Sequence, residues 1–496
     1  MPEILPDMSA KQAELGGTAT AFVDGETRYS FARVDVEAAA LAGGLRNLGL
    51  NPGDRLAALC HNRVEFFLIL FACQKAGLTL VPLNWRQPVA ELLPVLDGLS
   101  PAAILFDHAN AATGRALARR LKLQALTMDA PDPGETALAE LLEAEPLACD
   151  GVDAETPWYL LLTSGTTGQP KAVIQTARMA WANAVNVARA VDLTSADRSI
   201  NYLPLFHTAG INLYTLPVFL FGGTSTLVPR FEPDRILDLI LAGGITCFFG
   251  VPAIYQAFSL HPRVDEVDWS GLRMGCGGAP LPEPLIRFFA ERGGVICNGM
   301  GMTETGPTVF LMDPAHAPGK IGSVGKPQAM TQVRLAGVAQ GEPGRGEIEL
   351  RGPNITPGYF GNPEATVAAF TADGWLKTGD VGQRDADGYY RIVDRIKDMY
   401  ISGGENVYPA EVERVLNEHP EVLEAAVIGM ADERWGEVGA AFLLPRPGAA
   451  PDLDTLAPWC RERLAAYKVP KRFHLVEDFP RTAAGKIMKT ELRKRL

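Results

Sequence analysis

The sequence lacks the features that would place it in a membrane or a secretory class. Its longest uninterrupted apolar run, residues 66–73, is far shorter than the roughly 20 residues that a membrane-spanning helix needs. The first fifteen residues, MPEILPDMSAKQAEL, contain no basic segment followed by an apolar one, so no secretory signal is predicted. Seven scattered cysteines without C-x-x-C spacing predict reduced thiols and no zinc site. We therefore expect a cytoplasmic protein without a transmembrane segment.

An excess of basic residues is missing as well. The net charge of −12 argues against nucleic acid as a partner. The charge is unevenly distributed, because residues 461–496 contain 11 Lys or Arg and 4 Asp or Glu, which gives +7 there and −19 elsewhere. Solvated helix faces would explain such a basic end, and an anionic ligand is the alternative.

Short apolar runs alternate with longer stretches of helical spacing through most of the chain. Runs such as DRLAALC, LTLVPLN, AAILFD, SINYLPLF and TCFFGVP predict strands, and EFFLILFACQKAG and DRILDLILAGG predict helices. This alternation predicts an α/β fold of mainly parallel sheets covered by helices, over residues 1–396. Within it, Gly- and Asp-punctuated segments at about residues 320–393 predict a small β-rich subdomain. Residues 397–496, with a helix predicted over LDTLAPWCRERLAAYK, suggest a small α+β domain.

The segment LTSGTTGQPK follows a predicted strand and combines glycine, hydroxyl side chains and one lysine. Consecutive backbone N–H groups in such a turn form a concave anion-binding site, and a polyphosphate is the expected ligand. The spacing G-x-x-G-x-x-K differs from that of a Walker P-loop, and a plain surface loop is the alternative. The candidate phosphate-binding residues are Thr163, Ser164, Gly165, Thr166, Thr167, Gly168 and Lys171.

Six further segments follow in order: LPLFHTAG, GCGGAP, GMGMTETGP, WLKTGD, DRIKDMYISGGENVYPAEVE and PRTAAGKI. Together with LTSGTTGQPK they resemble the adenylate-forming superfamily of acyl-CoA synthetases, luciferases and nonribosomal adenylation domains. The resemblance extends from about residue 27 to the C-terminus and is strongest with fatty acyl-CoA ligases. It implies that a carboxylic acid reacts with ATP to give acyl-AMP and pyrophosphate, and that the acyl group then passes to CoA, with Mg²⁺ as cofactor.

The resemblance also assigns roles to the nucleotide site. Thr303 would contact the α-phosphate and Glu304 would bind Mg²⁺, which prefers hard oxygen ligands. Met300 stands where the family usually has an aromatic residue against adenine. The residues that resemble the adenine-binding strand ends are Gly277, Gly278, Ala279, Pro280, Asn298, Gly299, Met300 and Gly301.

The remaining assignments concern the ribose, the catalytic lysine and CoA. Asp380 and Arg395 resemble the ribose contacts, although T-G-D alone is more often a turn. Lys486 resembles the adenylation lysine, and Lys397 resembles the pivot of a mobile C-terminal domain. The loop of Ser402, Gly403 and Gly404 resembles the wall of the pantetheine channel, so the domain would rotate between the half-reactions.

The acyl pocket is predicted to be apolar. In the family, the residue at His207 gates the pocket, although a lone His after a strand is otherwise a core residue. An apolar lining without a cation favours a medium or long fatty acid, with an aryl or cinnamate-type acid as the alternative and dicarboxylates disfavoured. The predicted pocket residues are Phe206, His207, Gly210, Ile211, Tyr214, Gly278 and Gly301.

Three other classes share parts of this pattern. A luciferase-like oxidase would also form acyl-AMP, and a carrier-protein-loading enzyme would pass the acyl group to a tethered thiol. A non-catalytic nucleotide-binding protein fits less well, because every charged motif residue is present.

Overall fold

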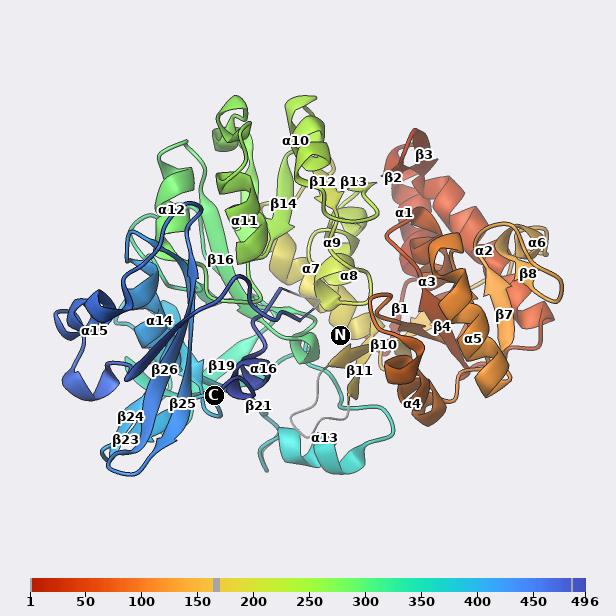
Figure 1. Cartoon of the computed structure of the whole chain (residues 1–496). Helices are drawn as coiled ribbons and strands as arrows, with labels where there is room; N and C mark the ends of the chain where they lie inside the picture. The colour runs from red at the N-terminus through yellow and green to blue at the C-terminus, as the bar shows by residue number, and fades with distance from the viewer. Residues whose placement is uncertain (1, 164–169, 483–484) are drawn as a thin grey trace.

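Two large sheets form the N-terminal part of the chain (Figure 1). The computed structural model describes residues 2–163, 170–482 and 485–496. In spatial order, the first sheet contains β11 (Lys171–Thr176), β10 (Pro157–Thr163), β5 (Thr79–Pro82), β4 (Arg55–Leu59), β6 (Ala103–Phe106), β7 (Gln124–Thr127) and β8 (Thr136–Ala137). The second contains β18 (Lys326–Pro327), β17 (Thr308–Leu311), β16 (Ile296–Gly301), β15 (Arg273–Cys276), β14 (Cys247–Gly250), β12 (Arg198–Asn201), β13 (Thr224–Leu227), β2 (Thr20–Asp24) and β3 (Thr27–Ser30).

Parallel pairing dominates the centres of both sheets, as the sequence predicts. Strand β4 pairs in parallel with β5 and β6, and β14 pairs in parallel with β12 and β15. The five apolar runs named above correspond to β4, β5, β6, β12 and β14. A separate short ladder joins β1 (Ile4–Leu5) to β9 (Val152–Asp153).

Helix α3 (Val64–Ala76) lies between the two sheets, and its residues are buried except for Glu65. Its aromatic residues share one core with both sheets, since Phe67 stacks on Phe22 of β2 and Phe71 contacts Phe219, with ring centroids 4.9 Å apart in both pairs. Burial on nearly every side explains why most residues of this helix are apolar. It ends at Gly77, whose φ of +68° suits glycine.

The other helices pack against the sheets, some of them in the core that contains α3. The helices before β15 are α1 (Met8–Gly16), α2 (Phe31–Asn47), α4 (Val89–Leu99), α5 (Ala111–Leu121), α6 (Leu138–Leu141), α7 (Ala177–Val191), α8 (Thr208–Asn212), α9 (Leu216–Leu220), α10 (Pro233–Leu241) and α11 (Pro252–Ser259). Helix α12 (Glu283–Ala290) joins β15 to β16, and α13 (Pro363–Ala369) precedes β21. Within the described residues, none of the helices is long and apolar enough to cross a membrane.

A β-rich subdomain and a C-terminal domain complete the fold. The subdomain sheet contains β19 (Gln332–Leu335), β20 (Gly344–Arg351), β21 (Leu376–Arg384) and β22 (Tyr390–Arg395). The C-terminal sheet contains β24 (Glu405–Val407), β23 (Tyr400–Ser402), β26 (Gly436–Pro445), β25 (Val422–Asp432) and β27 (Arg472–Leu475). It is packed by α14 (Pro409–Asn417), α15 (Leu453–Arg461) and α16 (Lys489–Arg493).

The predicted helix over residues 453–468 is shorter in the structure. Helix α15 ends at Arg461, and a 3₁₀ turn, Ala466–Lys468, follows after a break. Ala465 before this turn has an extended ψ of 145°, which interrupts the helical hydrogen bonds.

Candidate active site

The predicted phosphate-binding segment joins two antiparallel strands. Thr163, at the end of β10, pairs with Lys171, at the start of β11. The predicted residues Ser164, Gly165, Thr166, Thr167 and Gly168 lie outside the described residues. The segment is therefore followed by a strand, whereas a Walker P-loop opens a helix, and this agrees with the unusual spacing.

Lys171, Tyr359 and Glu304 form a chain of contacts beside this segment. The Lys171 ammonium lies 4.7 Å from the centroid of the Tyr359 ring, and the Tyr359 hydroxyl donates a 2.9 Å hydrogen bond to Glu304 Oε1. Burial, followed by Glu304, raises the pKa of Tyr359, so its hydroxyl keeps the proton that it donates. Tyr359 is not recognisable as a site residue from the sequence. It reaches this position because its segment pairs with β11, through Phe360 N–H to Ala172 O at 2.8 Å.

The predicted adenine-binding residues lie at neighbouring ends of β15 and β16. Gly277 and Gly278 follow β15, while Asn298, Gly299, Met300 and Gly301 belong to β16, which pairs with β15 in parallel. A Cβ added to Gly301 would lie 1.7 Å from Pro307 O, so only glycine fits there. The partly buried Met300 packs against the core of the β-rich subdomain.

Asp380, Arg395 and Lys486 come together from two domains. Asp380 and Arg395 are paired residues of β21 and β22, and Arg395 Nε donates a 3.1 Å hydrogen bond to Asp380 Oδ1. Burial raises the pKa of Asp380, while the charges of Arg395 and Lys486 oppose this shift. Burial, assisted by Arg395, lowers the pKa of Lys486, and Asp380 and Glu304 act in the opposite direction. The C-terminal lysine therefore lies inside the site of the N-terminal part.

His207 lies at the start of α8, six residues after β12. Its Nδ1 accepts a 3.3 Å hydrogen bond from the Ala209 N–H, so a neutral ring carries its proton on Nε2. Burial, followed by the charge of Lys486, lowers the pKa of His207 to about 4. The ring is therefore neutral at pH 7 and close enough to Lys486 to be affected by its charge.

The other predicted pocket residues divide into two groups. Ile211 is fully buried in the core that contains α3, and a Cβ on Gly210 would lie 2.4 Å from Pro204 O, so both residues serve packing. Phe206 instead contacts residues from another segment, since Trp85 meets it edge-on at 6.3 Å and Arg86 lies 5.8 Å from its ring centroid. Arg86 therefore lies beside a predicted pocket residue, although the two are far apart in the sequence.

The predicted CoA-binding loop lies apart from these residues. Ser402, Gly403 and Gly404 form the end of the β23–β24 hairpin, at the outer edge of the C-terminal domain and away from α8 and β11 (Figure 1). A Cβ on Gly403 would lie 2.9 Å from the Trp435 ring, while nothing lies within 4 Å at Gly404. Lys397 is exposed in the turn between β22 and β23. The structure therefore brings Lys486, and not this loop, to the site.

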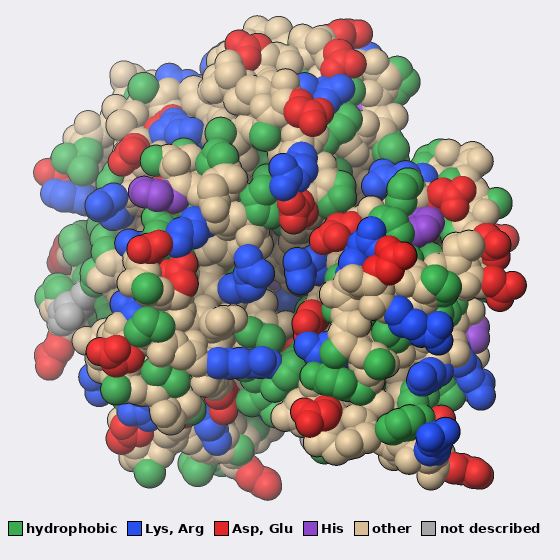
Figure 2. Space-filling view, turned by 90° about the vertical axis from the view of Figure 1, so that its left-hand side faces the viewer, with side chains coloured by type: hydrophobic (Ala, Val, Ile, Leu, Met, Phe, Trp, Pro, Cys, Tyr) green, Lys and Arg blue, Asp and Glu red, His purple; other side chains and the backbone are tan. Residues whose placement is uncertain are grey.

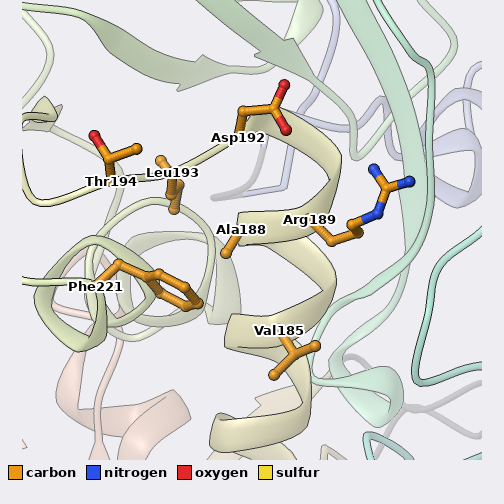
Figure 3. A pocket seen from close by; sticks show the side chains of 7 residues that line it. All are labelled: Val185, Ala188, Arg189, Asp192, Leu193, Thr194 and Phe221. Carbon is orange, nitrogen blue, oxygen red and sulfur yellow. The ribbon is translucent and has the colours of Figure 1, made fainter.

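Two surface features lie outside the predicted nucleotide site. A cavity of about 370 Å³ lies beside α7 and the end of α9, and no predicted site residue lines it (Figure 3). Its lining residues are Val185, Ala188, Arg189, Asp192, Leu193, Thr194 and Phe221. On the face that carries the C-terminal domain, Lys and Arg side chains gather around a hollow (Figure 2).

Comparison with known families decides between the remaining classes. The AMP-binding enzyme family matches residues 9–360, and the AMP-binding enzyme C-terminal domain matches residues 411–486. The chain belongs to the AMP-binding enzyme family. This agrees with the predicted resemblance and with the fold described above.

Relatives of this AMP-binding enzyme are CoA ligases. A feruloyl-CoA synthase from Amycolatopsis sp is 43% identical, covering 98% of this chain and 97% of the relative. An indoleacetate–CoA ligase from Aromatoleum aromaticum is 37% identical, covering 97% and 95%. The structure of O-succinylbenzoate coenzyme A synthetase from Bacillus subtilis with ATP and magnesium ion superposes with a TM-score of 0.87 at 31% identity, covering 99% and 100%. The protein is therefore an acid–thiol ligase that uses ATP, Mg²⁺ and CoA.

The residues of the site suit these ligands. The Oδ1 atom of Asn298 is buried and lacks a hydrogen-bond partner among the described residues, so it is available to a purine amino group. No described group of three His, Cys, Asp or Glu residues is arranged to hold a metal ion. The buried carboxylate of Glu304 nevertheless suits Mg²⁺, which binds through one or two carboxylates together with phosphate oxygens and water.

Proposed function

We propose that this enzyme joins an aromatic carboxylic acid to CoA through an acyl-AMP intermediate. The proposal rests mainly on the position of the Lys486 ammonium. It lies close enough to Glu304, Asp380, Arg395 and His207 to interact with them electrostatically. The feruloyl, indoleacetate and succinylbenzoate names of the relatives support an aryl acid better than the medium or long fatty acid favoured by the sequence. The aryl alternative of the sequence analysis therefore replaces the fatty acid as the proposed substrate.

In the first half-reaction, the acid attacks the α-phosphorus of ATP. Lys486 binds the carboxylate and α-phosphate oxygens, where negative charge converges as the new bond forms. Asp380 and Arg395 hold the ribose, and the segment from Thr163 to Lys171 holds the β- and γ-phosphates. Glu304 would hold Mg²⁺, which would supply neutralising charge at the phosphates.

In the second half-reaction, the thiol of CoA attacks the acyl carbonyl and AMP leaves. The loop of Ser402, Gly403 and Gly404 then forms the wall of the thiol channel, which requires the C-terminal domain to turn about Lys397. His207 lies where the acyl group and the thiol meet and acts as a neutral gate. The proposed domain division is therefore residues 1–396 and 397–496.

A panel of carboxylic acids with ATP, Mg²⁺ and CoA tests the proposal. Aryl and cinnamate-type acids should give acyl-CoA, AMP and pyrophosphate, with higher kcat/KM than octanoate or palmitate. Products are identified by mass spectrometry and by assay of AMP and pyrophosphate. A best substrate that is aliphatic would overturn the substrate class, and ADP with an acyl phosphate would overturn the mechanism.

A further inference from the structure

Tyr214 is a buried tyrosine whose hydroxyl has no hydrogen-bond partner among the described residues. Its side chain is almost completely buried, and its Oη is inaccessible to solvent. Neighbouring buried tyrosines are satisfied, since Tyr202 donates to Phe249 O at 2.9 Å and Tyr255 donates to Gly275 O at 2.7 Å. A buried hydroxyl without a partner is costly, so this group needs an explanation.

The surroundings of the hydroxyl are apolar and uncharged. The Phe249 ring meets the Tyr214 ring edge-on with centroids 5.8 Å apart. Burial raises the pKa of Tyr214 well above its ordinary value, with smaller contributions from Cys247 and Cys297, and burial raises the pKa of these two thiols to about 12. The phenol therefore keeps its proton and remains a donor.

A track of glycines leads from the nucleotide site to this hydroxyl. A Cβ added to Gly275 would lie 2.7 Å from Tyr214 Oη, and one added to Gly277 would lie 3.1 Å from Phe249 Cζ. The two glycines are two residues apart along an extended chain, so they face the same side and are separated by roughly 7 Å. Gly277 adjoins Gly278 of the proposed nucleotide site.

Helix α8 leads to the same place from the other side. It begins after His207, whose pKa responds to Lys486, and ends two residues before Tyr214. Five helical residues span about 7.5 Å, which is close to the span of the glycine track. The Tyr214 backbone is fixed, because its carbonyl accepts a 3.0 Å hydrogen bond from the Ser199 hydroxyl. Both elements thus run from the reacting centre to the phenol.

We propose that the Tyr214 hydroxyl closes the far end of the acyl pocket and hydrogen-bonds an oxygen substituent on the ring of the aryl acid. Tyr214 is then a specificity-determining residue for ring-hydroxylated acids, and Phe249 is the side wall next to it. This inference rests on the proposed aryl-acid activity. In this proposal, the substrate supplies the hydrogen-bond partner that the Tyr214 hydroxyl lacks among the described residues.

The test compares acids that differ only in a para hydroxyl: 4-hydroxycinnamate with cinnamate, and 4-hydroxyphenylacetate with phenylacetate. For Tyr214→Phe, the ratio of kcat/KM for the hydroxylated to the plain acid should fall at least roughly tenfold. Its melting temperature should equal or exceed that of the wild type, because an unpaired hydroxyl is removed. Tyr202→Phe is the matched control. It should lower the melting temperature and leave the ratio unchanged.

The outcomes separate this inference from the proposed function. If the wild type converts aryl acids but Tyr214→Phe leaves the ratio unchanged in every pair, the role of Tyr214 is wrong and the aryl-acid activity stands. If the wild type converts none of the four aryl acids, the proposed function fails and this inference fails with it. An equal change in the ratio for Tyr202→Phe would also overturn the assignment, because the effect would then be one of general packing.

Discussion

At the scale of single residues, Lys486 is a cation that the C-terminal domain inserts into a site built by the N-terminal part. Burial and Arg395 lower its pKa, whereas Asp380 and Glu304 raise it, so its charge depends on these neighbours. A flexible ammonium suits the proposed contact, which would form and break in each turnover.

Lys486→Ala should slow acyl-AMP formation by roughly 10² to 10³, the usual loss when one stabilising donor is removed. With preformed acyl-AMP and CoA, the variant should make thioester at a rate close to that of the wild type. Pyrophosphate release and thioester formation are measured separately. Equal losses in both half-reactions would contradict an adenylation-only role.

The low pKa of His207, about 4, predicts the pH dependence of the first half-reaction. A lowered pKa keeps the ring neutral above roughly pH 5, so acyl-AMP formation between pH 5.5 and 8 should show no ionisation of this histidine. Profiles of pyrophosphate release for the wild type and His207→Asn should have the same shape. An inflection near pH 6.5 that disappears in the variant would show that the ring titrates during turnover.

At the scale of elements, the β23–β24 hairpin is the part of the candidate site that is away from the other residues. Its two glycines have positive φ, +63° at Gly403 and +88° at Gly404, but only Gly404 has open space around it. A side chain at Gly404 could therefore contact the groups that face the hairpin after the proposed domain movement.

Gly404→Leu should spare acyl-AMP formation and reduce thioester formation at least roughly tenfold, a barrier increase of about 1.4 kcal/mol. Gly374→Leu is the control for backbone strain, because Gly374 has a φ of +83° and likewise nothing within 4 Å. The control should retain both half-reactions. Loss of both in Gly404→Leu, with normal folding by circular dichroism, would contradict the channel role.

Local sequence patterns predict strands that are buried on both faces. They do not predict contacts between residues that are far apart in the sequence. Strands β4, β5 and β6 are continuous apolar runs because both of their faces are covered, and such runs are recognisable in sequence. Tyr359 was missed because its partner Glu304 is 55 residues away and the two meet only through pairing with β11. Arg86 was missed for the same reason, since nothing near Phe206 in sequence indicates its approach.

At the scale of the whole molecule, the arrangement of the N-terminal part and the C-terminal domain matches only the first of the two proposed half-reactions. Lys486 is inserted beside Asp380 and Glu304, while the hairpin with Gly404 lies at the outer edge (Figure 1). One placement of the C-terminal domain cannot bring both to the acyl group, so the roles proposed for Lys486 and Gly404 imply a second placement.

Lys397→Pro should hinder this movement, because proline fixes φ in the turn between β22 and β23. Acyl-AMP formation should be retained and thioester formation should fall at least roughly tenfold, or about 1.4 kcal/mol. Lys397→Ala, which removes the side chain and keeps the backbone free, should retain both activities. Stopped-flow or quenched assays of each half-reaction check this. A loss in Lys397→Ala as large as that in Lys397→Pro would assign the effect to the side chain.

The position of α3 between the two sheets also bears on how the chain is made. The ribosome completes Val64–Ala76 early, but Phe219, which packs against Phe71, is synthesised 143 residues after Ala76. At ordinary elongation rates this delay is roughly 7 to 30 s, during which an apolar helix lacks part of its cover. Newly made chains are therefore prone to self-association at this stage. A chaperone that shields apolar segments would raise the yield of folded enzyme.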